Sequence, residues 1–146
     1  MDNRAVTVEI YLATEDDIKS SRKKFVFDWM HEYKILNRRV FKMVVAHTKK
    51  LEAFMSVTIF PNSHVWVWDV EKRNYKTNKV YNEVVTSFIA YACKISFDNN
   101  GKGFVGFTPK SDLYEFYTRE VYATELPNRS LEIQTDKALM LVHKYF

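Results

Sequence analysis

Four basic residues surround the start of a long amphipathic segment at residues 78–97. They are Lys72, Arg73, Lys76 and Lys79. The first turn of a helix presents unpaired backbone amides, and such amides together with cations bind phosphate groups. Glycine usually lets the phosphate approach, but the three glycines all follow the segment, at Gly101, Gly103 and Gly106. The residues alone therefore leave two interpretations open, a phosphate site built on cations or a solvated basic loop.

Two carboxylates, Asp69 and Glu71, end the stretch "HVWVWDVE", which alternates as a strand does. A carboxylate at such a position can accept a proton during catalysis, although most carboxylates at strand ends are surface groups. Glu83 stands one turn into the following segment, where its charge would oppose a bound phosphate.

Cys93 and the histidines offer little further chemistry. Cys93 lies within the segment 78–97, where a lone cysteine is expected to behave as a small hydrophobic residue. The four histidines do not have the spacing of metal ligands, so we predict no metal site.

The hydrophobic periodicity predicts the elements that position these residues. Strands are expected at 6–14, in a meander from about 39 to 71, at 103–107 and at 130–134. Helices are expected from residue 15, capped by Thr14, within 24–37, at 78–97, after Thr108, and at 136–146. The order β-α-α-β-β-β-α-β-α-β-α requires a right-handed crossover through the helix at 78–97. The fold class is thus α/β, with a mixed sheet.

Several positions are assigned to one face of their element. Val6, Val8, Ile10 and Leu12 are expected on a buried face of the first strand, and Phe25, Trp29, Tyr33 and Leu36 on one side of the helix within 24–37. Trp66 and Trp68 share one face of their strand, with Val65, Val67 and Asp69 on the other. The tryptophan pair either belongs to the core, which we favour, or lines an acceptor groove.

Composition restricts the class of protein. The chain has 146 residues, of which 47% are hydrophobic and 27% charged, an ordinary balance for one globular domain spanning 1–146. No apolar run is long enough for a membrane span, and a single cysteine allows no intramolecular disulfide, so we expect a cytoplasmic protein. The net charge of +4 is too small to indicate a nucleic-acid partner by itself.

The order of elements, together with five local stretches, resembles the GNAT superfamily of N-acetyltransferases, in particular a small bacterial subgroup. The stretches are "ATEDDI", "FDWMHEYK", "NKVYNEVVTSFIAYACKISF", "GFVGFTPKSDLYEFY" and "DKALMLVHKYF", and they span nearly the whole chain. The resemblance implies a GNAT-like sheet with one parallel pair of strands. It also implies that acetyl-CoA lies in a V-shaped gap where the strand before the crossover helix diverges from the strand after it.

The resemblance assigns roles to particular residues. Tyr117 stands where the family often has the acid that protonates the departing thiolate, although Tyr114 and Tyr122 share its aromatic helix. Glu71 is the expected base acting through water, in preference to Asp69. The backbone of the stretch that includes Asp69, Val70 and Glu71 would receive the pantetheine arm and the thioester oxygen. The pyrophosphate would be held by Lys72, Arg73, Lys76, Asn78 and Lys79.

The chain departs from the family's pyrophosphate motif, which has Arg or Gln, two residues, Gly, one residue, and Gly or Ala. Val80 takes the basic position, Glu83 the first glycine, and Val85 or Thr86 the second. Two functions therefore stay open. One is an N-acetyltransferase that uses acetyl-CoA and a primary amine; the other is an inactive GNAT-fold binding or regulatory protein that has lost acyl-CoA binding. A nucleic-acid-binding module is a third, lower-ranked class, and a homodimer is left open.

Overall fold

The computed structural model describes residues 7–73, 78–108, 117–119, 122–127 and 130–146, with the backbone alone at 78–82. Its seven strands form one sheet in the order β1-β2-β3-β4-β5-β7-β6. Only β4 and β5 pair in parallel, and every other neighbouring pair is antiparallel. The strands are β1 (Val8–Leu12), β2 (Arg39–Val45), β3 (Leu51–Ile59), β4 (Val65–Lys72), β5 (Val105–Phe107), β6 (Thr124–Glu125) and β7 (Leu131–Ile133). The predicted mixed sheet is confirmed.

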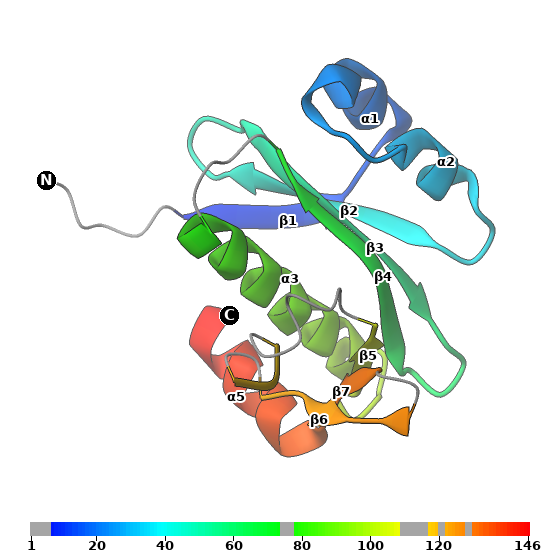
Figure 1. Ribbon diagram of the computed structural model, residues 1–146, viewed down its shortest axis with the longest axis vertical. Helices are drawn as coiled ribbons and strands as arrows, with labels where there is room; N and C mark the ends of the chain where they lie inside the picture. The colour runs from blue at the N-terminus through cyan, green and yellow to red at the C-terminus, as the bar shows by residue number, and fades with distance from the viewer. Residues whose placement is uncertain (1–6, 74–77, 109–116, 120–121, 128–129) are drawn as a thin grey trace, which may run out of the picture.

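Helices cover both faces of the sheet (Figure 1). One face carries α1 (Glu15–Ser21), the short 3₁₀ turn η1 (Arg22–Lys24) and α2 (Trp29–Lys34). The other carries α3 (Asn78–Asp98), which connects β4 to β5, and α5 (Thr135–Tyr145). The helix expected after Thr108 falls largely on residues outside the described ranges, although Tyr117–Arg119 are helical. The short strand β6 was not predicted.

The N-terminus of α1 has the predicted cap. Thr14 Oγ1 accepts a hydrogen bond from the backbone N of Asp17 at 3.1 Å, and Asp17 Oδ2 accepts one from the backbone N of Thr14 at 2.8 Å. This reciprocal pair satisfies two backbone donors that the helix leaves free. The cap fixes the residue at which α1 begins after β1, and therefore the start of the helical layer on this face of the sheet.

The second helix is shorter than its hydrophobic spacing predicted. It starts at Trp29 because the Asp28 carboxylate caps it, accepting from the backbone N of His31 at 3.0 Å. Phe25 therefore precedes the helix, and Leu36 follows it with 85% of its surface exposed. The assignment of Phe25 and Leu36 to this helix was wrong, whereas Trp29 and Tyr33 lie one turn apart within it, as predicted.

The buried face predicted for the first strand was wrong at Val8 and Leu12, and Val6 lies outside the described residues. Val8 is 36% exposed and Leu12 is 56% exposed, while Ile10 packs against the main core. The reason is that β1 lies at the edge of the sheet, where it pairs with β2 alone. An edge position leaves part of a strand without a covering layer, which alternation cannot reveal.

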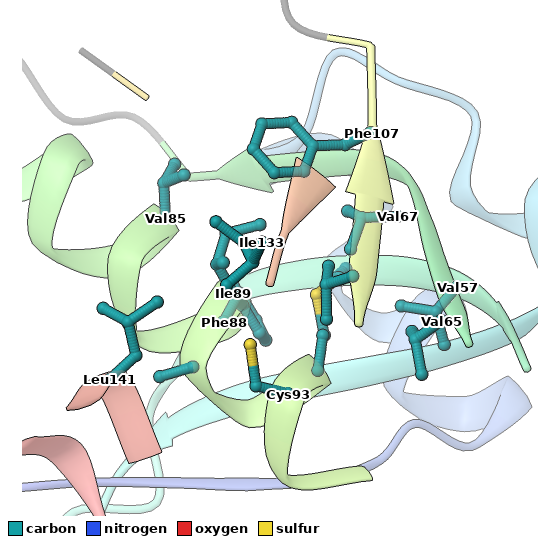
Figure 2. Close-up of a cluster of buried hydrophobic side chains, with 14 of the residues drawn as sticks. Val57, Val65, Val67, Val85, Phe88, Ile89, Cys93, Phe107, Ile133 and Leu141 are labelled. Atoms are coloured by element: carbon teal, nitrogen blue, oxygen red, sulfur yellow. The ribbon is translucent and has the colours of Figure 1, made fainter. Parts of the chain in front are cut away.

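The main core fills the space between the sheet and the α3–α5 layer (Figure 2). α3 supplies a buried stripe, which confirms the amphipathic helix expected at 78–97 over these residues: Val84, Val85, Phe88, Ala92 and Ile95. Central strands contribute valines to the same cluster. The residues include Val57, Val65 and Val67, and α5 closes the layer with Leu141.

A smaller cluster lies on the opposite face, beneath α1 and α2. It contains Ala13, Ile18, Trp29, Met30, Val40 and Phe54. Phe54 from β3 is fully buried, and its ring centroid lies 5.3 Å from that of Trp29. This cluster holds α2 against the sheet and thereby places the segment before α2 beside β4.

Candidate functional site

The parallel pair diverges at one end, and a cavity of about 540 Å³ lies there. Pairing of β4 with β5 runs from Val65 opposite Val105 to Val67 opposite Phe107. Beyond this point β5 ends, while β4 continues to Lys72. The cavity is lined by β4 residues 67–71, by Phe107 and Thr108, by Tyr117, by Ile89 of α3 and by residues 26–29.

A glycine allows β4 and β5 to pair just before they diverge. Gly106 lies opposite Trp66 in the parallel register, and a Cβ at this position would lie 2.7 Å from two atoms of the Trp66 ring. The Trp66 ring therefore packs across the β5 backbone. This contact fixes the point from which the two strands separate.

A β-bulge in β4 changes which side chains of the strand lie on the face covered by α2. Ser56 is paired with Asp69, whereas the next residue, Val57, is paired with Val67, so Trp68 is the extra residue. Asp69 consequently shares a face with Glu71, as predicted, but not with Val65 and Val67, as was also predicted. The bulge is the reason, because it shifts the alternation by one residue.

Glu71 joins β4 to the segment that precedes α2. Its Oε2 accepts from the backbone N of Val26 at 2.8 Å, and its Oε1 accepts from the backbone N of Phe27 at 3.1 Å. The indole Nε1 of Trp29 donates to the same Oε1 at 2.8 Å. One carboxylate therefore holds residues 26–29 against β4. We call these residues the shared wall, because they line this cavity and also a second one. The role of Glu71 as a base stays a prediction.

The tryptophan pair does not belong to the core, contrary to the favoured interpretation. Trp66 is half-buried and Trp68 is 42% exposed, and Trp68 lines the cavity. The Arg38 guanidinium lies 4.0 Å from the centroid of the Trp68 ring, and Trp68 Nε1 donates to Thr58 Oγ1 at 2.8 Å. Stacking and hydrogen bonding thus hold Trp68 at the mouth of the site.

Behind Trp68 lies a buried polar network that sequence reasoning missed. Glu32 is 1% exposed, and its Oε1 accepts from Arg38 Nη1 at 2.7 Å and from Ser56 Oγ at 2.7 Å. These partners offset the cost of burying the polar carboxyl group. Helical spacing offered a weak signal, because Glu32 interrupts the apolar side of α2 next to Met30 and Trp29.

Tyr117 also lines the cavity. It is 7% exposed, and its ring packs edge-on against Phe107 with centroids 4.7 Å apart. The divergence of β4 and β5 therefore brings Tyr117 and Glu71, predicted from distant parts of the sequence, to one cavity. The role of Tyr117 as the acid stays a prediction.

The predicted phosphate-binding residues have different environments. Lys72 has a buried Nζ, and burial lowers its pKa to about 8, an effect that the nearby Glu52 carboxylate partly opposes. Arg73 is half-buried, Lys76 lies outside the described residues, and Asn78 and Lys79 are described by their helical backbone alone. Glu83 is exposed one turn into α3. Lys72 is thus less open to a ligand than a loop cation would be.

Cys93 is a core residue, as predicted. It is fully buried beneath the sheet (Figure 2), and burial raises the pKa of its thiol to about 12. In the part of the chain that the structure describes, no three His, Cys, Asp or Glu side chains gather as metal ligands do. None of the described helices combines the length and apolar composition needed to cross a bilayer.

Comparison with solved structures defines the class of fold. Spermidine N-acetyltransferase from Vibrio cholerae, in complex with CoA and spermine, matches with a TM-score of 0.67 at 11% identity, over 90% of this chain and 98% of that one. This similarity, with the mixed sheet and the single parallel pair, shows a GNAT-like fold. No protein-family model and no curated protein matches the sequence.

Two further structures have the same fold. A bacterial toxin matches with a TM-score of 0.69 at 11% identity, over 97% of this chain and 98% of that one. The other is a point mutant of the toxin AtaT, bound to the C-terminus of the antitoxin AtaR and acetyl-CoA. It matches with a TM-score of 0.58 at 9% identity, over 92% of this chain and 97% of that one. At these identities the similarity concerns the fold.

Proposed function

We propose that this protein is an N-acetyltransferase that transfers the acetyl group of acetyl-CoA to a primary amine. The observation that carries the proposal is the cavity at the divergence of β4 and β5, which unites Tyr117 with Asp69 and Glu71. Its volume of about 540 Å³ lies in the range of small-molecule sites. Structural neighbours that were crystallised with CoA or acetyl-CoA support the choice of co-substrate.

In the proposed reaction the amine nitrogen attacks the thioester carbonyl carbon, and the carbon–sulfur bond breaks. The ammonium proton first passes through water to Glu71, and the departing thiolate takes a proton from the Tyr117 hydroxyl. A carboxylate has about four acceptor positions, so three hydrogen bonds leave Glu71 about one for that water. Asp69, which lines the same cavity, is the alternative base.

The first experiment is calorimetric titration of the protein with acetyl-CoA and with CoA. A micromolar dissociation constant is expected, and thiol release with a panel of primary amines then identifies the acceptor. Failure to bind CoA at millimolar concentration would exclude the proposal. It would also indicate that Arg73, Lys76 and Lys79 do not replace the missing glycines of the phosphate motif.

Tyr117→Phe tests the acid. We expect kcat to fall by about 10²–10⁴, the usual contribution of a general acid, while the fold is retained. Tyr122→Phe is the matched control, because Tyr122 is 42% exposed and is not among the residues that line the cavity. Unchanged turnover in Tyr117→Phe would remove this hydroxyl from the mechanism.

Asp69→Asn and Glu71→Gln distinguish the two carboxylates. Loss of the base should reduce kcat/KM most at neutral pH, and the loss should shrink at high pH, where the free amine needs no base. If kcat/KM falls by the same factor at every pH, the carboxylate positions other groups of the site and does not act as the base.

A second function is favoured by specific observations. α3 begins at Asn78 without glycine, and the nearest strand cation, Lys72, has a buried ammonium group. A GNAT-fold binding protein without acyl-CoA affinity would have these features. The same titration with CoA separates the two candidates.

A further inference from the structure

A second cavity, of about 510 Å³, lies between α1 and α2 on the other side of the shared wall. Apart from Val26 and Phe27 of the shared wall, its apolar lining comes from the smaller core cluster. These residues are Ile18, Phe25, Trp29, Met30 and Phe54. All but Phe25 are less than 9% exposed, so the cavity is backed by ordered core side chains. It is large enough for a small organic molecule and does not belong to the proposed acetyl-transfer site.

Its polar lining is mainly basic. Arg22 directly follows α1, Lys34 ends α2, and His31 lies between them in the sequence. Among the described residues, neither Arg22 nor Lys34 forms an ion pair, whereas the cations Lys19, Arg38, Lys42, Lys49 and Lys94 all do. The single carboxylate in the lining, Asp28, already accepts from the backbone N of His31.

From this geometry we infer that the α1–α2 cavity binds a small organic anion, a carboxylate or a phosphate on an aromatic or aliphatic body. The body would lie against Trp29 and Phe25, where removal of apolar surface from water supplies the affinity. The charged group would lie toward Arg22 and Lys34, whose planar guanidinium and ammonium groups bind carboxylates and phosphates. A neutral ligand of the same shape lacks the charge-assisted hydrogen bonds to the two cations and should bind more weakly.

Occupation of this cavity is coupled to the larger one through the shared wall. Val26, Phe27, Asp28 and Trp29 line both cavities. The wall is held by Glu71, which accepts from the backbone N of Val26 and of Phe27 and from the indole of Trp29. A ligand packed against Trp29 therefore restricts the residues that also bound the β4–β5 cavity. The inference extends beyond acetyl transfer and does not require it.

The test is calorimetric titration with 2-naphthoate, with the neutral 2-naphthamide as the matched ligand. We expect naphthoate to bind at least ten-fold more tightly than naphthamide. The Arg22→Gln/Lys34→Gln double variant should lose this difference. A Lys50→Gln/Lys102→Gln variant, which removes two exposed cations outside the cavity lining, should retain it. No binding of naphthoate at 5 mM, equal binding of the amide, or an unchanged difference in the Arg22/Lys34 variant would overturn the site.

Hydrogen exchange tests the coupling separately. Saturating naphthoate should slow exchange of the Val26 and Phe27 amides, because both donate to Glu71 across the shared wall. The amides of β7, a strand that lines neither cavity, should exchange at an unchanged rate. Binding without any change at Val26 and Phe27 would overturn the coupling. Because neither readout uses acetyl-CoA, failure here is distinguishable from failure of the acetyltransferase proposal.

Discussion

Glu71 on β4 and Trp29 on α2 are joined by a hydrogen bond of 2.8 Å from the indole Nε1 to Oε1, across 42 residues of sequence. The same carboxylate also accepts the backbone amides of Val26 and Phe27. A single strand residue thus fixes a wall of the candidate acetyl-transfer site. Whatever part it has in proton transfer, Glu71 has a structural role that its position at a strand end did not indicate.

Glu71→Gln should lower the free energy of unfolding by about 2 kcal/mol. The amide loses the negative charge, and its NH₂ group faces one of the three donors that the carboxylate satisfies. Urea unfolding measures the change. Glu125→Gln, at an exposed position on β6, should change stability by less than about 0.5 kcal/mol. Equal effects in the two variants would contradict the role of Glu71.

Arg38→Met should destabilise the protein by about 3 kcal/mol or more. It leaves the carboxylate of Glu32, which is 1% exposed, with Ser56 as its remaining partner among the described contacts. The double variant Glu32→Leu/Arg38→Met should recover much of this loss, because no buried charge is then left unpaired. A double-mutant cycle by urea unfolding gives the coupling. Additive losses would show that the two side chains do not depend on each other.

Because of Lys72, the free energy of unfolding should increase as the pH rises into the alkaline range. Burial lowers its folded pKa to about 8 from an ordinary 10.5. Between these values the unfolded chain binds a proton that the folded protein does not, so the free energy of unfolding rises with pH over this window. Wild type should therefore gain stability relative to Lys72→Met between pH 7 and pH 9.5. A Lys102→Met control removes an exposed lysine, and parallel pH profiles for wild type and Lys72→Met would contradict the shifted pKa.

Cys93 should be inert to thiol reagents in the folded protein. With its pKa raised to about 12 by burial, roughly one thiol in ten thousand is ionised at pH 8. Reaction with 5,5′-dithiobis(2-nitrobenzoate) should therefore require unfolding, and its rate should rise with urea as the core opens. Cys93→Ala should retain acetyl transfer with a small loss of stability. Rapid labelling of the native protein would show that the thiol is accessible.

Local sequence patterns predicted most of the elements. Thr14 and Asp17 form the expected cap, and Val84, Val85 and Phe88 form the expected buried stripe of α3. The alternation of 64–71 and the short apolar run at 103–107 gave the strands that pair in parallel. Each of these patterns depends on neighbours within about a turn of helix or along one strand, and such interactions are specified by adjacent residues.

The errors arose where distant segments decide the outcome. Leu12 is exposed because β1 is an edge strand, and Asp69 leaves the face of Val67 because a bulge opposite Ser56 shifts β4 by one residue. The Glu32–Arg38 pair was missed because its burial depends on β3, which lies later in the chain.

The sequence by itself determined most of the elements, the mixed sheet and the presence of Tyr117 and Glu71 as candidates. Only the tertiary structure decided that these two residues line one cavity, that Glu71 holds residues 26–29, and that a second basic cavity shares this wall. The physical reason is range. Capping and periodicity arise from contacts between near neighbours, whereas burial, bulges and cavities result from the packing of segments that the sequence keeps far apart.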